Sequence, residues 1–206
     1  GGGKRELRAP GLSVWFRPDR TPEEASAFYG AELTIWPGPK ERKEKRSLRA
    51  HLLIFRFDRQ GRLAELQGMK SASFLREPLP PEKGAPQELD ARNFVATFDP
   101  ASGALASVDA RGDVDYRQGL RHAAGERGTF QADRNRLALM KGRPSLEEQG
   151  TSRLTAERIE IDTVTGEVEA RGYAQQTLFK SGSAPALVTG GAAADQATLI
   201  SAASLR

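Results

Sequence analysis

The sequence predicts an all-β protein with an elongated body built of repeated hairpins. One phrase recurs, in which alternating apolar residues lead to Asp, a few polar residues and usually Gly, and then to a second alternating run that ends in a small residue and Gly. The copies are residues 57–68, 98–112 and 161–172, with a weaker one at 132–142. The closing glycines Gly112, Gly142 and Gly172 are evenly spaced. Restatement of one unit at a fixed spacing is typical of a repeat architecture.

The chemistry of the phrase predicts a turn between two strands. The carboxylates of Asp58, Asp99 and Asp162 can accept hydrogen bonds from backbone N–H groups two residues on, and the glycine that follows takes a positive φ without steric cost. A lone hairpin of this kind cannot bury its apolar face, but stacked hairpins cover one another and share one interior.

The runs on either side of these turns predict half-buried strands. Residues 51–57 and 94–98 alternate apolar and polar side chains with a period of two. Residues 154–161 alternate less cleanly, and the skip from Ala156 to Ile159 predicts a bulge.

The N-terminal part of the chain fits this pattern less well. Residues 12–16 alternate weakly, and residues 27–36 have strand character that ends at 37–39. Between them, Thr21, Pro22 and the two carboxylates that follow have the composition of a helix start and predict a one-turn insertion.

Three stretches interrupt the strands. The charged run at 40–46 predicts a solvated loop, and the Pro-rich stretch at 79–86 predicts a junction between an N-terminal part and the regular repeats. The Gly, Ala and Ser-rich stretch at 181–194 predicts poor order.

These features predict one elongated domain over residues 1–180, with an irregular N-terminal part at 1–47 and the repeats at 48–180. Residues 181–206 are expected to hold the poorly ordered segment and the start of a further repeat, which is strand-like at 197–202.

The composition limits the kinds of covalent, metal and catalytic site that the chain can form. The 206 residues include no Cys, which excludes disulfides and thiolate sites, and only two His. No metal, cofactor or catalytic site is expected, because nucleophile, phosphate-loop and zinc motifs are absent and the carboxylates sit in turns or on outward positions. A hydrolase with paired carboxylates stays open as an alternative. The glycines at the start and the strand-like end suggest a piece of a longer protein, so a missing signal peptide says nothing about compartment.

Three segments carry a resemblance to a known family: 123–133, 142–146 and above all 154–173. The last has Leu, x, Ala, a charged pair and Ile, then the Asp turn with Gly, and then x, apolar, x, Ala, x, Gly. This resembles the OstA-like family, the repeat of the periplasmic lipopolysaccharide-transport proteins LptA and LptC and of the N-terminal domain of LptD. The resemblance covers roughly residues 48–180. Two segments depart from the family pattern. The turn at 133–136 lacks Gly, and the charged run at 40–46 is not a feature of the family.

The resemblance implies an OstA-like β-jellyroll, V-shaped in section, whose two sheets leave an apolar groove. It further implies a periplasmic module that shelters the acyl chains of lipopolysaccharide or another glycolipid on the way to the outer membrane. The candidate lipid-binding residues are those that alternation places inward: Phe55, Phe57, Leu66, Phe94, Phe98, Val108, Phe130, Leu137, Leu139, Ile159, Ile161 and Val168. Plain core packing is the alternative for each of them.

Two functions from different classes therefore stand. The first is the lipid-transport module, which would bridge end to end with other OstA-like proteins or with itself through edge strands near 14–16 or 198–200. The second is a purely structural β-repeat of an envelope or surface protein that binds no ligand. A nucleic-acid partner is not expected, because acidic residues interleave with the basic cluster at 40–49 and no aromatic stacking platform accompanies it.

Overall fold

The computed structural model describes residues 4–38, 43–148, 151–178, 186–188 and 198–200. These residues form 16 antiparallel strands and no helix. The strands are β1 (Arg5–Arg8), β2 (Gly11–Phe16), β3 (Pro22–Ile35), β4 (Glu44–Phe57), β5 (Leu63–Pro78), β6 (Gln87–Phe98), β7 (Leu105–Gln118), β8 (Arg121–Gln131), β9 (Arg136–Met140), β10 (Ser145–Glu148), β11 (Ser152–Thr155), β12 (Arg158–Asp162), β13 (Val168–Arg171), β14 (Gln175–Leu178), β15 (Ala186–Val188) and β16 (Thr198–Ile200).

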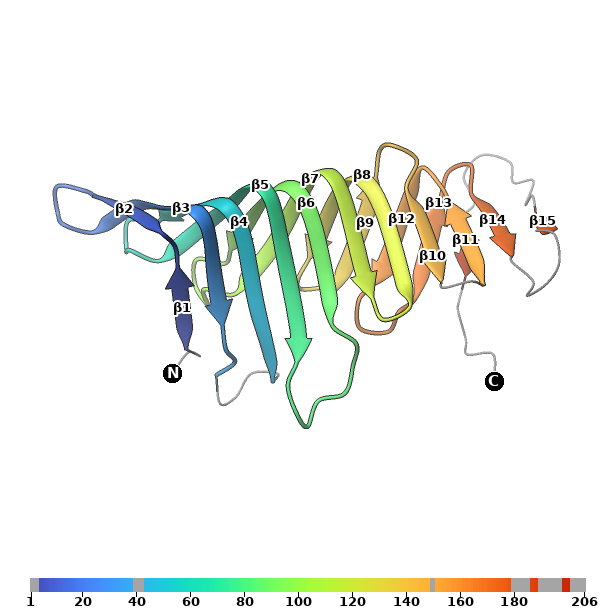
Figure 1. Ribbon diagram of the computed structural model, residues 1–206, viewed down its shortest axis with the longest axis horizontal. Coiled ribbons are helices and arrows are strands. Elements are labelled where there is room, and N and C mark those ends of the chain that lie inside the picture. Colours follow the sequence, from blue (N-terminus) through green and yellow to red (C-terminus); the bar gives the residue numbers. More distant parts are fainter. Residues whose placement is uncertain (1–3, 39–42, 149–150, 179–185, 189–197, 201–206) are drawn as a thin grey trace.

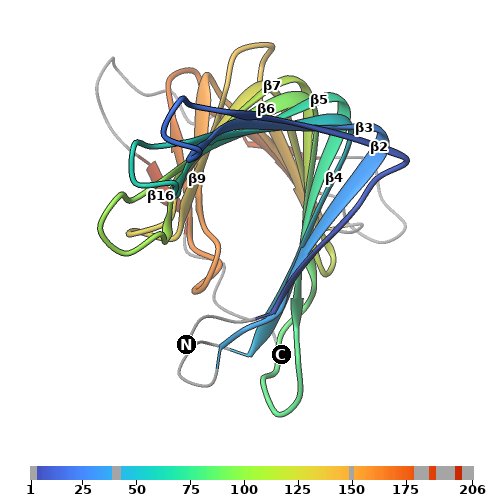
Figure 2. The same cartoon turned by 90° about the vertical axis from the view of Figure 1, so that its left-hand side faces the viewer.

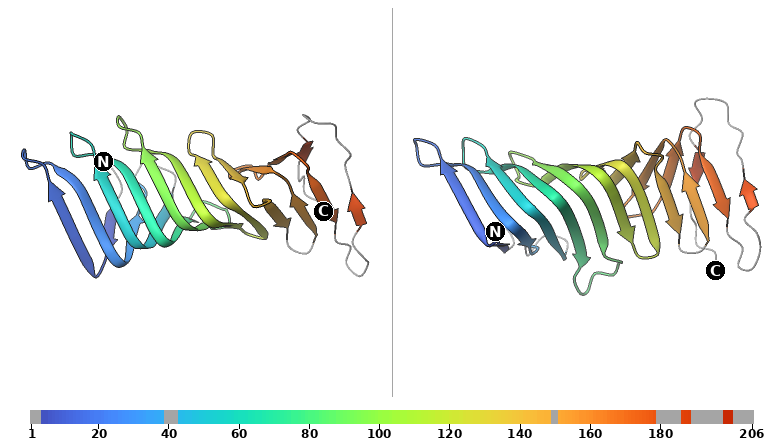
Figure 3. Two further views of the ribbon diagram at one scale, coloured as in Figure 1. Left: turned by 90° about the horizontal axis from the view of Figure 1, so that it is seen from above. Right: turned by 45° about the horizontal axis from the view of Figure 1, so that its top comes forward.

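The strands follow one another along the long axis of the molecule in nearly chain order (Figures 1 and 3). Each long strand from β3 to β8 crosses the whole width of the body and bends at its middle. The bends divide the single sheet into two arms, which diverge from a common ridge when the molecule is viewed end-on (Figure 2). The expectation of an elongated all-β jellyroll is confirmed, and the two expected sheets are the two arms of one folded sheet.

The two arms have separate strand partners beyond the shared strands. Arm 1 is bounded by β1 and continues through the C-terminal part of β3 to β10, β11, β14 and β15. Arm 2 is bounded by β2 and continues through the N-terminal part of β3 to β9, β12, β13 and β16. The long strands β3 to β8 therefore extend both arms at once, whereas each of the shorter strands extends one arm.

Register shifts create the ridge between the arms. They interrupt the pairing at one level of every long strand, and they fall between Phe28 and Ala31, Arg49 and Leu52, Met69 and Ala72, Asp90 and Asn93, and Arg111 and Val114. Because extra residues in one strand bend it and increase its twist, a row of such shifts folds the sheet.

The glycines that close each phrase lie in this ridge, and the sequence-based expectation that they end a hairpin is wrong. Gly112 has a φ of 78° at the bend of β7, and Gly142 and Gly172 have φ values of 65° and 69° in the breaks from β9 to β10 and from β13 to β14. A Cβ on Gly172 would lie 2.3 Å from the Glu157 carboxylate across the ridge. These positions require Gly because the backbone is left-handed and a neighbouring side chain passes over it.

The Asp turns are confirmed. The Asp99 carboxylate accepts hydrogen bonds from the N–H groups of Ala101 and Ser102 at 3.1 and 2.7 Å, and Gly103 N–H donates to the Asp99 carbonyl at 2.8 Å. Asp162 repeats this arrangement. In the copy without a turn glycine, Asn135 takes the left-handed position with a φ of 51°, as its short polar side chain permits.

Two expectations for the N-terminal part are wrong. No helix starts at Thr21, because Asp19 accepts its N–H and hydroxyl in a tight turn and β3 begins at Pro22. The part before residue 47 is also not irregular between residues 5 and 35, because β1, β2 and β3 form regular pairs that extend both arms. Inward alanines on β3, rather than large apolar residues, conceal the alternation there.

Three expectations about interruptions also fail. Residues 79–86 connect the paired neighbours β5 and β6 and so mark no junction. The charged run enters β4 at Glu44, where cross-strand pairing buries its carboxylate; residues 40–42 lie outside the described residues. The skip after Ala156 is a break rather than a bulge, because β11 belongs to arm 1 and β12 to arm 2.

The segment expected to be poorly ordered, 181–194, lies outside the described residues apart from β15. The strand expected near 197–202 is present as β16, which pairs with β13. The division of the chain at residue 180 stays a prediction.

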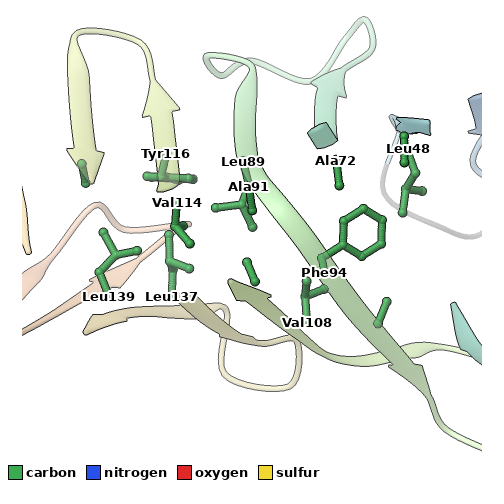
Figure 4. Close-up of a cluster of buried hydrophobic side chains, with 14 of the residues drawn as sticks. Leu48, Ala72, Leu89, Ala91, Phe94, Val108, Val114, Tyr116, Leu137 and Leu139 are labelled. Atoms are coloured by element: carbon green, nitrogen blue, oxygen red, sulfur yellow. The ribbon is translucent and has the colours of Figure 1, made fainter. Parts of the chain in front are cut away.

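The core lies between the arms. Figure 4 shows inward side chains from arm 1, among them Leu48, Leu89 and Tyr116, facing Phe94 and Leu139 of arm 2. Burial of these apolar side chains from both arms supplies the main stabilisation of the fold.

Candidate functional site

The inner surface of arm 2 is a candidate lipid-binding surface, and it carries every residue that the sequence predicted to bind lipid. Side chains directly opposite on neighbouring strands make a continuous row across arm 2, which runs through Val14, Ala25, Phe55, Leu66, Ala96, Val108, Phe130, Leu137, Ile161 and Val168. A second row, closer to the ridge, runs through Leu12, Ala27, Leu53, Gly68, Phe94, Ala110, Gly128, Leu139, Ile159 and Ala170.

Most of the predicted residues are buried in the core. The buried ones are Phe55, Leu66, Phe94, Val108, Leu137, Leu139, Ile159, Ile161 and Val168. The other three, Phe57, Phe98 and Phe130, are partly buried and pack against the core. Phe57 and Phe98 lie farther from the ridge than the first row, whereas Phe130 belongs to that row. The fold brings all of them to one surface, and their contact with a ligand stays a prediction.

The facing surface on arm 1 was not predicted from the sequence. Its row of opposed residues runs through Leu7, Leu33, Leu48, Phe74, Leu89, Tyr116, Ala123, Leu146 and Leu154. The alternation of Val114 and Tyr116 just beyond Gly112 is the signal that could have found it. That signal was missed because Gly112 was interpreted as the end of a hairpin instead of the middle of a strand.

The interior is exposed at its N-terminal end. Leu12 and Val14 on β2 face inward opposite the buried Ala27 and Ala25, yet they are 56% and 40% exposed. Leu7 on β1, opposite the buried Leu33, is 37% exposed. The two edge strands thus present apolar inward side chains to solvent, and the apolar interior is accessible there.

Each arm has a free edge on the side away from the ridge, where its strands end in turns and loops. The free edge of arm 1 is polar on its inner side. One step from the apolar row towards the edge, opposed residues form a polar rim that consists of Arg46, Arg76, Gln87, Gln118, Arg121 and Glu148. Arg76 forms a bidentate ion pair with the buried Glu44 and donates to Gln87 at 3.3 Å. Polar side chains at the rim and apolar ones behind it give the interior an amphipathic cross-section.

The turn between β12 and β13 reaches from arm 2 to this rim. Gln87 and Gln118 both donate to the Thr163 carbonyl, at 2.8 and 3.2 Å, and Arg121 donates to the Gly166 carbonyl at 2.9 Å. A cavity of about 200 Å³ lies beside these contacts. Its lining includes Glu44, Arg76, Lys83, Gln87, Gln118 and Thr163.

Buried Tyr116 supports the rim from below. Burial raises the pKa of the Tyr116 phenol above its ordinary value, although the nearby Arg121 and Arg76 act in the opposite direction. The phenol therefore stays protonated and donates to the Gln118 side chain at 3.0 Å, which orients the amide that holds Thr163.

The basic cluster at the start of β4 is paired within the described part of the chain. Lys45 contacts Glu77 at 2.8 Å, Arg49 contacts Glu32 at 3.0 Å, and Arg46 lies 3.6 Å from Glu44. Lys45 and Arg49 are thus engaged in cross-strand ion pairs, and Arg46 pairs within β4.

Among the described residues, no group of three or more His, Asp or Glu is placed to hold a metal ion. No described helix has the length and apolar character needed to span a membrane.

Comparisons with known proteins find little. No protein-family model matches the chain, and no curated protein matches it either. Among solved structures, it is similar to LptH from Pseudomonas aeruginosa, described as the LptA homologous periplasmic component of the lipopolysaccharide transport device. That similarity covers 82% of this chain and 83% of LptH, with 14% sequence identity and a TM-score of 0.32. A similarity this weak carries no inference about what this chain does.

Proposed function

We propose that this protein is a lipid-binding module that shelters acyl chains between its two arms. The single observation behind the proposal is the pair of continuous apolar rows that crosses arm 2 and becomes solvent-exposed at Leu12 and Val14. Acyl chains need only continuous apolar walls, and each buried methylene contributes about 0.8 kcal/mol. An accessible end to such an interior gives the chains a place to enter.

The proposed ligand is a lipopolysaccharide or a related glycolipid, carried across the periplasm to the outer membrane. The resemblance of residues 154–173 to the OstA-like repeat supports this choice. The polar rim of arm 1 also suits a lipid whose headgroup is polar, because the headgroup could stay at the rim while the acyl chains lie behind it.

A purely structural β-repeat is the second candidate, and one observation favours it. Leu139, Ile159 and Ile161 have no exposed surface, so side chains already fill the interior at that level. In this alternative the exposed end is only the unfinished edge of a packed body.

Binding of a fluorescent lipid A analogue distinguishes the two candidates. We expect saturable binding by the wild type, and a loss of at least about tenfold in affinity in Leu12→Asp, because a carboxylate placed on the apolar wall must be desolvated by the acyl chains. Trp15→Asp is the matched control, since Trp15 is adjacent to Val14, 50% exposed and on the opposite face of the same strand. No saturable binding by the wild type, or equal losses in both variants, would exclude the carrier function.

We further propose that the module bridges to other transport proteins of its kind, or to itself, through its edge strands. Trp36 N–H donates to the Lys4 carbonyl, so in the antiparallel pair of β1 and β3 the N–H groups of Arg5 and Leu7 point away from the sheet. Unpaired outward donors of this kind are a template for another strand.

Sedimentation velocity at increasing concentration tests the bridging. Arg5→Pro removes one outward donor without removing a bond to β3, and it should weaken self-association or partner binding while leaving the unfolding midpoint nearly unchanged. Arg5→Ala is the control and should assemble like the wild type. Equal assembly of both variants would exclude β1 as the contact.

A further inference from the structure

The turn between β12 and β13 joins the two arms on the side away from the ridge. The arms share the ridge on one side and end in free edges on the other, so a contact between the free edges closes the cross-section. Residues 163–166 of arm 2 make that contact with β6, β7 and β8 of arm 1.

The contact is a set of discrete hydrogen bonds. Neutral amides of Gln87 and Gln118 converge on one acceptor, the carbonyl of Thr163, and Arg121 is held for its bond to Gly166 by Glu148 at 2.7 Å. Bonds of this kind contribute modestly to stability, so they can open without unfolding the strands behind them.

Arm 2 holds the turn in place from its own side. Thr163 is 2% exposed, and both its N–H and its hydroxyl donate to the Asn135 carbonyl, at 2.8 and 3.0 Å. The turn is therefore preorganised by arm 2, and the contacts with arm 1 are the ones free to open.

The row of inward side chains that ends at this turn is buried or partly buried from β3 onward, for example at Leu66, and becomes exposed on the edge strand β2. Leu137 and Ile161, which lie on the row that leads to the turn, are 2% and 0% exposed, whereas Val14 on the same row is 40% exposed. The interior is therefore buried along most of its length and exposed at the N-terminal end, and the strap contact covers the section that holds Leu137 and Ile161.

We infer that residues 162–167 form a strap that closes the mouth of the interior and opens to admit or release a ligand sideways. With the strap closed, acyl chains reach this section lengthwise along the interior rather than sideways between the arms. The consequence for ligands rests on the proposed lipid-binding function, but the closure itself does not.

Thiol labelling tests the closure without any lipid. The chain has no Cys, so L137C places one reactive thiol behind the strap. In this background we expect Gln87→Ala with Gln118→Ala to raise the maleimide labelling rate about tenfold or more, because two hydrogen bonds to Thr163 are lost. Arg117→Ala is the matched control, since Arg117 adjoins Gln118 but pairs with Asp115 on the outer face.

A second probe separates local opening from unfolding. L53C lies in the same core, fully buried but far along the sheet from the strap. Its labelling rate should not change in the double variant. Equal acceleration of both probes, or no acceleration of L137C relative to the Arg117→Ala control, would overturn the strap.

Lipid release then tests the consequence. Gln118→Cys with Val164→Cys, joined by a short bismaleimide after loading with the fluorescent lipid A analogue, should release the lipid at least several-fold more slowly than the same variant before crosslinking. Release at an unchanged rate would exclude sideways exit past the strap. Absence of lipid binding in the wild type would count against the proposed function, while the labelling result would still decide the closure.

Discussion

The N-terminal end and the section behind the strap are built from the same rows of residues but differ in exposure. Val14 and Ile161 occupy one cross-strand row, and Leu12 and Ile159 occupy the next. Leu12 and Val14 are exposed, whereas Ile159 and Ile161 are fully buried. The difference shows that apolar alternation places a side chain inward, but contact between the arms decides whether it is sealed from water.

The same difference separates two roles for an apolar residue. Behind the strap, both arms cover each inward side chain, so these residues stabilise the fold. At the edge strands β1 and β2 the inward side chains have neighbours on one side only, so they contribute less to stability and remain available for contact. Substitutions at matched positions can test this separation.

The largest expected effect is that of an inward carboxylate. Ile159→Asp should lower the free energy of unfolding by at least about 4 kcal/mol, because it removes a fully buried side chain and places a polar group in an apolar interior. Leu12→Asp on the same row should change it by less than about 0.5 kcal/mol, since that position is already solvated. Urea denaturation measures both values, and similar losses in the two variants would show that the interior is sealed at both ends.

A smaller effect is expected where an aromatic ring lies over a glycine. Phe94 is opposite Gly68 in the core, and Phe28 is opposite Gly11 on the outer face of the N-terminal end. A Cβ would lie 2.4 Å from the first ring and 2.1 Å from the second. The sterics are similar, but only the second ring has solvent into which it can move.

Gly68→Ala should therefore cost about 1–3 kcal/mol of unfolding free energy, as overpacking of a rigid core does. Gly11→Ala should cost less than half as much, because Phe28 is only partly buried. Thermal unfolding of the two variants gives the comparison, and a larger cost at Gly11 would contradict the view that the N-terminal end is the looser region.

Much of the repeat pattern could be predicted from the sequence. Asp99 and Asp162 hold their turns through the backbone contacts that their spacing implied, and all the predicted inward residues lie on one surface. Local chemistry decides such features. The ridge could not be predicted, because a left-handed Gly112 suits a hairpin end and a strand bend equally well, and only pairing with β6 and β8 distinguishes them.

The strap could not be predicted from the sequence either. Its contacts join Thr163 to Gln87 and Gln118, which are 76 and 45 residues away in the chain, and no local pattern marks two glutamines as partners of one carbonyl. The N-terminal strands were missed for a related reason. Small inward residues such as Ala25 and Ala27 are buried only because neighbouring strands supply the bulk.

The smallest expected effect is the response to low pH. It compares the Asp162 turn, which forms the strap, with the equivalent Asp58 turn. Partial burial opposes ionisation of Asp162, but N–H donation from Thr165 and Val164 outweighs it and holds the pKa of Asp162 below its usual value. In the turn between β4 and β5, N–H donation from Arg62 is the main cause that lowers the pKa of Asp58. The Arg62 side chain and the N–H of Gln60 lower it further.

Because both pKa values are lowered by folding, each carboxylate stabilises the protein above the ordinary Asp pKa, and that contribution is lost as the pH falls through the lowered value. Below about pH 4, the labelling rate of L137C relative to that of a free thiol at the same pH should therefore rise as the Asp162 turn weakens; the ratio is needed because only the thiolate reacts with maleimide. Asp162→Asn retains an acceptor but not the charge, so it should remove most of this pH dependence, whereas Asp58→Asn should leave it in place. If Asp58→Asn has the same effect on L137C as Asp162→Asn, acid loosens the whole sheet and the turn that bears the strap has no separate part in closing the interior.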